Sequence, residues 1–432
     1  MLYNNLSVNE NSILCMNGYN LKELAEKYGT PLYVMDEDRI RNNINQIQLS
    51  VMKYFHHSQI LFASKACDFM AMYKICKDEG IGVDVVSPGE IYSAHKAGFP
   101  MQDVYFHGNS KSKADIEFAI DLGVGCFVVD NVDEARYLEE IAFSKNIKQK
   151  VLLRITPGID PHTYEAVSTG IVDCKFGSAI VTGAAEDLLK FVLNCEHIEC
   201  AGFHCHIGSQ IFESEIFKMS ARVMLEFCAQ MKDKFGFHVK ELNLGGGFSI
   251  RYLEDDPKFD IDSNMGMIHK EMISVCESLG LKLPKILFEP GRSIVGDAGL
   301  TLYQVNSVKK ILGGHNYIGI DGGMTDNPRY ALYRSKYTVL CGNKMNEEHV
   351  FPCVIAGRCC ESGDLISKDA YLPESIQIDD LVVVLTTGAY NYAMASNYNR
   401  FGKPAVVMLN KKEDRIVVKR ETLEDIIRND YE

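Results

Sequence analysis

The segment Leu61-Phe62-Ala63-Ser64-Lys65-Ala66 has a pattern that recurs along this chain and predicts its architecture. It is a short apolar run, starting at Ile60, with one ionisable side chain near its end. This pattern is typical of a parallel strand that is covered on both faces and carries a polar group at its carboxyl end. Seven further runs of the same kind follow: Gly82–Ser87, Val104–Gly108, Cys126–Asn131, Lys150–Ile155, Cys200–Gly208, Glu241–Gly247 and Lys285–Gly291.

Segments of helical length separate these runs, and one precedes the first of them. They are Arg39–Phe55, Met70–Glu79, Gly89–Ala97, Lys113–Leu122, Val132–Phe143, Ala184–Asn194, Glu213–Lys234 and Ile268–Leu279. Strands that alternate with helices over about 250 residues are the pattern of a TIM barrel. We therefore predict an α/β fold with a (β/α)8 barrel over residues 36–298.

The pattern changes after Leu300, where short strands with turns replace the alternation. The clearest of these strands are Val350–Ile355, Asp380–Thr386 and Pro404–Leu409. The N-terminal arm also holds little helix apart from Leu21–Tyr28. We predict a second, β-rich domain of the sandwich or barrel type, built from residues 1–35 plus 299–432.

Composition narrows the class of protein. The chain has 432 residues, 46% hydrophobic and 24% charged, and its formal net charge is −13, so it lacks the basic surface that nucleic acid requires. The 14 cysteines show no metal-ligand spacing, and residues 1–12 do not resemble a secretion signal. No apolar run is long enough to span a bilayer. We expect a cytoplasmic enzyme with reduced thiols, no metal site and no contact with membranes.

Polar residues recur near the carboxyl ends of the predicted strands. They are Lys65, Asp84, His107, Arg154, His204, His206, Ser209, Gly245 to Gly247, and Glu289 to Arg292. Ionisable groups rarely enter such apolar strands without a partner. Because catalytic groups of TIM barrels lie at this end of the strands, the pattern predicts a polar site at the barrel mouth.

Lys65 and Glu289 are the two residues with the most specific chemistry. A desolvated lysine amine is a good nucleophile and can form a Schiff base, although most lysines are surface charges. A carboxylate such as Glu289 can keep a pyridine nitrogen protonated, although a satisfied structural carboxylate is as common.

The glycines after the seventh strand form a second constellation with the end of the eighth. Loops at these two positions often bind phosphate in TIM barrels. Gly245-Gly246-Gly247 let backbone N–H groups approach the oxygens, and Arg292 adds a charged fork. His206 is either a core residue or a ring that lies flat on a cofactor, and we expect that Ser209, three residues further on, can reach a phosphate oxygen.

The motifs taken together resemble a known family. They include Gly202-Phe203-His204-Cys205-His206-Ile207-Gly208-Ser209, Leu244-Gly245-Gly246-Gly247-Phe248, Phe288-Glu289-Pro290-Gly291-Arg292, Asp321-Gly322-Gly323-Met324, Cys360-Glu361-Ser362-Gly363-Asp364 and Gly388-Ala389-Tyr390. In this order the chain resembles the fold-type-III, alanine-racemase-like pyridoxal-phosphate enzymes. Within that group it is most similar to the diaminopimelate decarboxylase family, over about residues 30–407.

The resemblance implies a role for each site residue. Lys65 would hold pyridoxal 5'-phosphate, Glu289 would pair with its ring nitrogen, and His206 would stack on the ring. The phosphate would lie among Ser209, Gly245, Gly246, Gly247, Gly291, Arg292 and Tyr390. Asp84 and Arg154, from the second and fifth strands, complete the expected cofactor-binding set. The substrate, meso-diaminopimelate, would be held by Arg292, Arg329, Tyr333, Glu361 and Tyr390.

The resemblance also implies that Cys360 donates the proton that replaces carbon dioxide, and that Cys360 and Glu361 act in a partner's barrel in a homodimer. Three alternatives remain open: a related decarboxylase acting on ornithine, lysine, arginine or carboxynorspermidine, an amino-acid racemase, and a non-catalytic homologue. The chain departs from the family pattern at Cys67, Ser249 and Asn391, and at Tyr164 after a lid-like loop that starts at Pro157.

Overall fold

The computed structural model describes residues 3–160, 170 and 172–431. The chain forms two compact units. One comprises Ile44–Ser249 and Phe259–Gly291, and the other comprises Met1–Asn43, Ile250–Lys258 and Arg292–Glu432. We call the first the barrel unit and the second the β-rich unit.

The barrel unit is built on eight parallel strands that close on themselves. They are β5 (Ser58–Ala63), β6 (Gly82–Val85), β7 (Val104–Phe106), β8 (Cys126–Val129), β9 (Gln149–Thr156), β11 (Ile198–His204), β12 (Glu241–Asn243) and β13 (Lys285–Phe288). The ring closes because β13 pairs with β5 and β8 pairs with β9, and the two-residue strand β10 (Ser178–Ala179) adds to β9. All eight predicted strands are confirmed.

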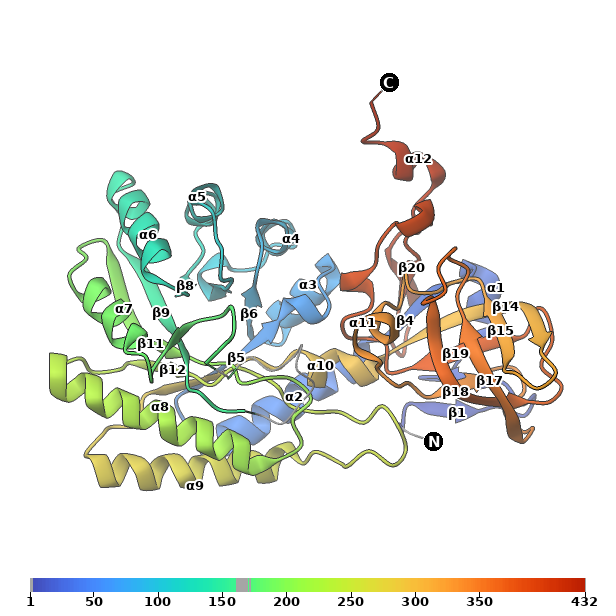
Figure 1. The fold of residues 1–432 in the computed structure, drawn as a ribbon, viewed down its shortest axis with the longest axis horizontal. Helices are drawn as coiled ribbons and strands as arrows, with labels where there is room; N and C mark the ends of the chain where they lie inside the picture. Colours follow the sequence, from blue (N-terminus) through green and yellow to red (C-terminus); the bar gives the residue numbers. More distant parts are fainter. Residues whose placement is uncertain (1–2, 161–169, 171, 432) are drawn as a thin grey trace. The chain divides into compact units, whose positions relative to one another are not determined.

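Helices surround this barrel, as Figure 1 shows for α3 to α9. The structure contains α2 (Glu37–Tyr54), α3 (Met70–Asp78), α4 (Pro88–Lys96), α5 (Lys113–Asp121), α6 (Val132–Ser144), α7 (Ala184–Leu193), α8 (Ser214–Phe235) and α9 (Ile261–Leu279). Only α9 starts well before its predicted position. Its N-cap, Asp260, accepts hydrogen bonds from the N–H groups of Asp262 and Ser263, so the helix begins ahead of its first strongly apolar turn.

All barrel strands except β9 end earlier than the sequence predicts. β5 stops at Ala63, and Lys65 lies in a 3₁₀ turn, η1 (Ser64–Ala66). The N–H of Cys67 donates to the carbonyl of Ser64 over 2.8 Å, which turns the chain out of the sheet. β11 likewise ends at His204, so His206 follows in a loop.

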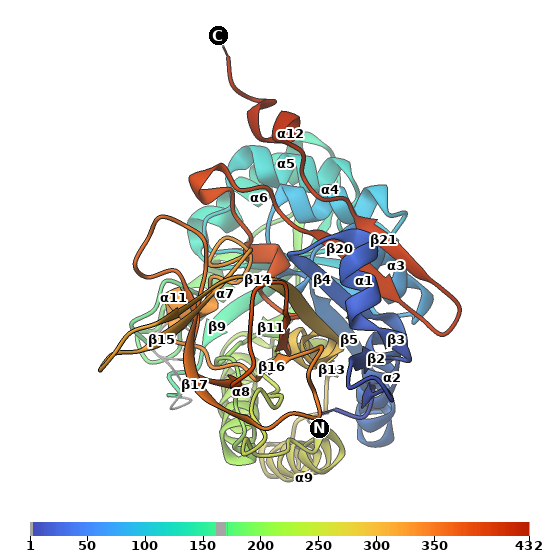
Figure 2. The same cartoon turned by 90° about the vertical axis from the view of Figure 1, so that its right-hand side faces the viewer.

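The β-rich unit holds a sheet in the order β18-β17-β15-β14-β4-β20-β21, with β19 also paired to β14 and β16 paired to β19. Its strands are β4 (Leu32–Asp36), β14 (Gly299–Lys310), β15 (Asn316–Ile320), β16 (Val339–Cys341), β17 (His349–Ala356), β18 (Leu365–Pro373), β19 (Leu381–Leu385), β20 (Ala405–Leu409) and β21 (Asp414–Val418). The N-terminal arm inserts β4 between β14 and β20, which Figure 2 shows from the side of this unit. The prediction that the arm joins the C-terminal third is confirmed.

Smaller elements complete the β-rich unit. They are β1 (Leu6–Val8), β2 (Leu14–Met16), β3 (Tyr19–Asn20), α1 (Leu21–Tyr28), α10 (Arg292–Val295), α11 (Arg329–Tyr333) and α12 (Leu423–Ile427). The sheet has a core on each face, because alternate residues of one strand pack in different clusters. In β19, Val382 and Val384 belong to one cluster, and Val383 and Leu385 belong to the other.

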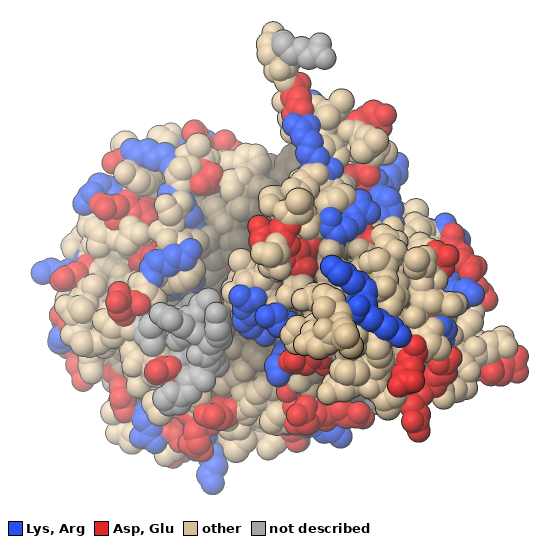
Figure 3. Space-filling view, turned by 45° about the vertical axis from the view of Figure 1, so that its right-hand side comes forward, with Lys and Arg blue, Asp and Glu red and all other residues tan. Residues whose placement is uncertain are grey.

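Within the described part of the chain, every helix is too short or too polar to cross a bilayer. On the face drawn in Figure 3, lysine and arginine side chains lie scattered among acidic ones. This face therefore offers mixed charge rather than one continuous basic surface.

A buried ion pair links three parts of the barrel. Lys111, in the loop after β7, lies 2.7 Å from Glu134 on α6, and both side chains are almost inaccessible to solvent. Lys111 also donates to the carbonyls of Gly108 and Val128, over 2.8 and 2.9 Å. The ammonium group is fully hydrogen-bonded, which is the condition for burying it.

We predict that Lys111→Ala lowers the free energy of unfolding by about 3 kcal/mol, because it leaves the Glu134 charge buried and unpaired. The matched control is Lys113→Ala, whose partner Glu140 is half exposed, and its expected loss is below about 1 kcal/mol. Urea unfolding followed by circular dichroism measures both. Equal losses in the two variants would contradict the prediction.

Candidate active site

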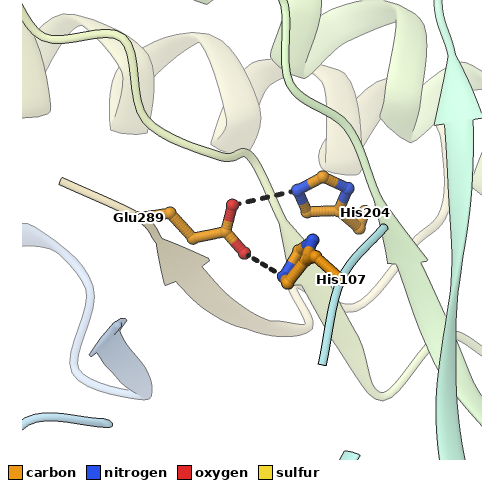
Figure 4. Close-up of side chains that lie close together, drawn as sticks. All are labelled: His107, His204 and Glu289. Carbon is orange, nitrogen blue, oxygen red and sulfur yellow. Dashed lines mark hydrogen bonds and ion pairs between the residues drawn. The ribbon is translucent and has the colours of Figure 1, made fainter. Parts of the chain in front are cut away.

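The buried carboxylate of Glu289 follows β13 and is held by three side chains. His204 Nε2 lies 3.0 Å from its Oε2 atom, and Asn243 Nδ2 donates to Oε1 over 2.6 Å. His107 Nε2 lies 2.9 Å from Oε1. Figure 4 shows the two imidazoles facing the two carboxylate oxygens. His204 is the last residue of β11, Asn243 is the last residue of β12, and His107 follows β7. Closure of the barrel therefore brings the three side chains together.

This network keeps Glu289 ionised. Burial alone raises the pKa of the carboxyl, but His107 and His204 outweigh it and hold that pKa well below the ordinary value. Burial lowers the pKa of His204 to about 4, so this ring is neutral at pH 7 and donates its Nε2–H to Glu289. An ionised carboxylate in this position can pair with a protonated ring nitrogen.

Lys65 reaches solvent although Ser64 and Ala66 on either side of it are buried. Burial, followed by the charges of Lys65 and Arg154, lowers the pKa of His206 well below its ordinary value, so this imidazole is neutral. A neutral ring can lie against a cationic heterocycle without repelling it.

Asp84 is the last but one residue of β6, and its Oδ1 atom is buried. This oxygen has no hydrogen-bond donor among the described residues, and His107 Nε2 is 3.7 Å away. Burial raises the pKa of Asp84, while His107 and Lys65 oppose the rise. A buried carboxylate oxygen that lacks a donor fits a site completed by a bound group.

The loop after β12 is a glycine cradle. Gly245 and Gly247 have positive φ values of 69° and 104°. A Cβ atom on Gly245 would lie 2.6 Å from the carbonyl oxygen of Cys205, and one on Gly246 would collide with that of Glu289. The N–H of Gly246 donates to His206 Nδ1 over 3.3 Å. Only glycine allows the backbone to pass this close to the strand ends.

The remaining predicted residues of the barrel unit lie around these groups. The Arg154 guanidinium stacks on the ring of Phe176 at 4.4 Å. Gly291 packs against the lysine turn, since an added Cβ would lie 3.0 Å from the Cβ atom of Ala63. Ser209 is partly exposed in the loop after β11.

A second cluster, within the β-rich unit, gathers two arginines around one ring. The guanidinium carbons of Arg292 and Arg329 lie 4.8 and 5.4 Å from the ring centre of Tyr390, and Arg329 lies 5.0 Å from that of Tyr333. Arg292 also donates to the Tyr252 hydroxyl. The Nε atom of Arg329 is buried and has no hydrogen-bond partner in the described chain. Two buried guanidinium groups this close together suit anionic ligands.

Tyr390 is held in an unusual backbone conformation. Its φ is 60°, in the left-handed region that side chains disfavour. The buried side chain of Asn391 donates to the carbonyls of Thr387 and Ala389, over 3.1 and 3.0 Å. These two bonds fix the turn, which explains why this chain has Asn at the position.

Cys360 and Glu361 lie in a different loop of the β-rich unit, and both are exposed. Asp364 holds this loop by accepting from the N–H groups of Cys359 and Met324, over 2.7 and 2.6 Å. The N–H of Cys360 donates to Asn399. The loop therefore presents the thiol outward.

The structure brings most predicted residues into two groups. The barrel unit holds Lys65, Asp84, Arg154, His206, Ser209, Gly245 to Gly247, Glu289 and Gly291, and the β-rich unit holds Arg292, Arg329, Tyr333 and Tyr390. Sequence reasoning missed Asn243 and Tyr252. Asn243 carried a usable signal, as a polar residue at a strand end, whereas Tyr252 carried none. Most of the lid-like segment, including Tyr164, lies outside the described residues.

Comparison with known proteins identifies the family. Residues 38–296 match the model of the pyridoxal-dependent decarboxylases, pyridoxal binding domain. The diaminopimelate decarboxylase of Bacillus subtilis (strain 168) is 44% identical over 98% of this chain and 96% of its own length. That of Bacillus methanolicus is 44% identical over 96% of this chain and 95% of its own.

A solved structure leads to the same family. The diaminopimelate decarboxylase of M. jannaschii in complex with L-lysine superimposes with a TM-score of 0.92 and 31% identity, and the match covers 99% of this chain and 98% of that one. The site residues, the matched domain and these full-length similarities agree, and the chain belongs to the pyridoxal-dependent decarboxylases, in the diaminopimelate decarboxylase family.

Proposed function

We propose that this chain removes one carboxylate from meso-diaminopimelate and releases L-lysine and carbon dioxide, the last step of lysine biosynthesis. The arginine pair around Tyr390 carries the proposal, because diaminopimelate has a distal carboxylate in addition to the reacting one. The names of the full-length relatives support this substrate. A lysine/ornithine decarboxylase from Vibrio vulnificus, at 22% identity, supports the fold alone.

Pyridoxal phosphate fits the residues of the barrel unit, and when bound it supplies the electron sink for the decarboxylation. Lys65 would be the amine that holds it, and Glu289 would keep its ring nitrogen protonated. His206 would cover the ring as a neutral imidazole, and Asp84 would offer the acceptor that lacks a donor. Gly245 to Gly247 would present the backbone to the phosphate, together with Ser209, Gly291, Arg292 and Tyr390.

The substrate would be oriented by its two ends. Arg292, Arg329 and Tyr333 hold the carboxylate oxygens that do not react, and Glu361 accepts from the distal amine. The reacting carboxylate is best left without a cationic partner, since a cation would stabilise it before it leaves. After carbon dioxide departs, the thiol of Cys360 gives its proton to Cα.

The exposed Cys360 loop is the reason to propose a homodimer. A proton donor has to be shielded from water during the reaction, and both Cys360 and Glu361 are exposed in one copy. We propose that this loop completes the barrel of a second copy.

The 14 thiols are free, which fits a reducing compartment, and we place the enzyme in the cytoplasm. We propose that the barrel domain spans residues 36–298 and that the β-rich domain is made of residues 1–35 and 299–432.

Lys65→Ala should abolish both turnover and the visible absorption band of lysine-bound pyridoxal phosphate, because no other amine replaces the lost bond. Lys74→Ala, an exposed lysine on α3, is the control and should keep both. Absorbance spectra of the purified proteins with added cofactor test this. An unchanged spectrum of Lys65→Ala would rule out the assignment.

Arg329→Gln should lower kcat/KM for meso-diaminopimelate about thirtyfold, equivalent to about 2 kcal/mol for a charged hydrogen bond. The control is Arg334→Gln, an exposed arginine just after α11, which should change it less than about twofold. Carbon dioxide release is assayed for meso-diaminopimelate, L-lysine and L-ornithine in parallel, and lysine release for meso-diaminopimelate. Turnover of ornithine or lysine alone would refute the distal-carboxylate argument.

Mixing two inactive variants tests the shared site. Lys65→Ala and Cys360→Ala each lack one essential group, but a mixed dimer holds one site with both groups intact. After unfolding and refolding together, the mixture should regain about a quarter of the wild-type activity, since half of randomly formed dimers are mixed. A mixture as inactive as its components would argue for sites contained in one chain.

A further inference from the structure

A second buried glutamate lies directly behind the turn that carries Lys65. Glu90 is on α4 and is 8% exposed, and Ser64, the residue before Lys65, is completely buried. The hydroxyl oxygen of Ser64 lies 2.7 Å from Glu90 Oε2 and 2.6 Å from the backbone carbonyl oxygen of Asp84. The same Glu90 oxygen accepts the N–H of Val86 over 2.7 Å.

Two full hydrogen bonds at these two short oxygen–oxygen distances need two hydrogens. The Ser64 hydroxyl has one hydrogen, and the carbonyl of Asp84 can only accept. If the Ser64 hydrogen points to that carbonyl, the contact between Ser64 and Glu90 needs a hydrogen on the glutamate. A carboxylic acid O–H can donate to Ser64 and still accept from Val86, which satisfies every distance observed.

The surroundings favour the protonated form. Burial, with smaller contributions from the charges of Asp84 and Asp68, raises the pKa of Glu90 to about 7, although hydrogen bonds from Ser64 and Val86 lower it. Tyr73 on α3 also faces this group, and burial raises its pKa, so it stays neutral. The acid form of Glu90 is therefore present below about pH 7 and is lost as the pH rises above it.

Glu90 also occupies the third position of α4, where an acidic residue often serves as a cap. The spacing Ser87-Pro88-Gly89-Glu90 is that of a capping box, and Ser87 accepts the N–H of Glu90 over 3.2 Å. A cap of this kind is strongest when ionised. If Glu90 acts mainly as a helix cap, its stabilising effect should increase as the pH rises above 7. If it acts as a protonated acid, its effect should decrease over the same range.

We propose that Glu90 acts as a protonated carboxylic acid that holds Ser64, and through it the turn carrying Lys65, so that it is a positioning residue for the lysine. This inference rests on the proposed role of Lys65. When Glu90 loses its proton, Ser64 has to give its hydrogen to the carboxylate and release the Asp84 carbonyl. The lysine turn then loses one of its two anchors.

The test compares the wild type with Glu90→Gln, whose amide keeps the donor and the acceptor but cannot ionise. Infrared difference spectra of the holoenzyme without substrate show the carbonyl stretch of a protonated carboxylic acid, which a carboxylate lacks. Burial also raises the pKa of Asp326 to about 7, so the Glu90 band is read from the difference between the wild type and Glu90→Gln. We expect this difference to contain the band at pH 6 and to lose it with a midpoint near pH 7. Glu140→Gln, an exposed residue on α6, is the control and should leave the band unchanged.

Two further readouts separate positioning from capping. In Glu90→Gln, the alkaline decline of kcat/KM and of the visible cofactor band should move up by at least one pH unit, with values at pH 6.5 within about twofold of wild type. Ser64→Ala should keep the infrared band but shift it to higher frequency, because the acid loses its acceptor. If Glu90→Gln has the wild-type infrared spectrum or the wild-type pH profile, the inference is wrong. If the wild type forms no lysine from meso-diaminopimelate although its infrared titration is as expected, the proposed function alone is refuted.

Discussion

Glu289 carries a negative charge among apolar, buried strands, and such a charge persists only where hydrogen bonds replace the lost water. Its three partners come from or follow β7, β11 and β12, while Glu289 itself follows β13. No local segment can supply this set. The ladder that closes the barrel therefore also creates the charged centre of the site, and a slip of one residue in any of these strands would turn a partner away.

The positions of the strands could be predicted from the sequence, but the hydrogen-bond partners of the site side chains could not. Buried parallel strands are apolar throughout, so short apolar runs located all eight. Hydrogen bonds set by distant residues leave no such pattern. The turn that lifts Lys65 out of β5 depends on a backbone bond from Cys67, and the early start of α9 depends on its cap at Asp260. Asn243 is a polar residue at a strand end, but its partner Glu289 lies 46 residues further on, and nothing in the sequence pairs the two.

The β-rich unit shows how a departure from a family pattern can be structural rather than functional. Asn391 differs from the residue expected there, yet its amide holds the carbonyls of Thr387 and Ala389, which lead into the Tyr390 turn. A left-handed tyrosine is unfavourable by about 1 kcal/mol, and two buried hydrogen bonds are enough to offset this. The ring of Tyr390 is thereby held close to two cations, with its centre 4.8 Å from the Arg292 guanidinium and 5.4 Å from that of Arg329.

Glu289 and Glu90 illustrate how the same side chain takes opposite charge states inside one barrel. Both are buried, so desolvation disfavours ionisation in each. Glu289 faces two imidazoles and an amide, and every one of them can donate. Glu90 has contacts of hydrogen-bond length with one N–H, that of Val86, and with the Ser64 hydroxyl, whose hydrogen already has an acceptor in the Asp84 carbonyl. The number of donors left for the carboxylate, rather than the degree of burial, decides which glutamate holds a charge and which holds a proton.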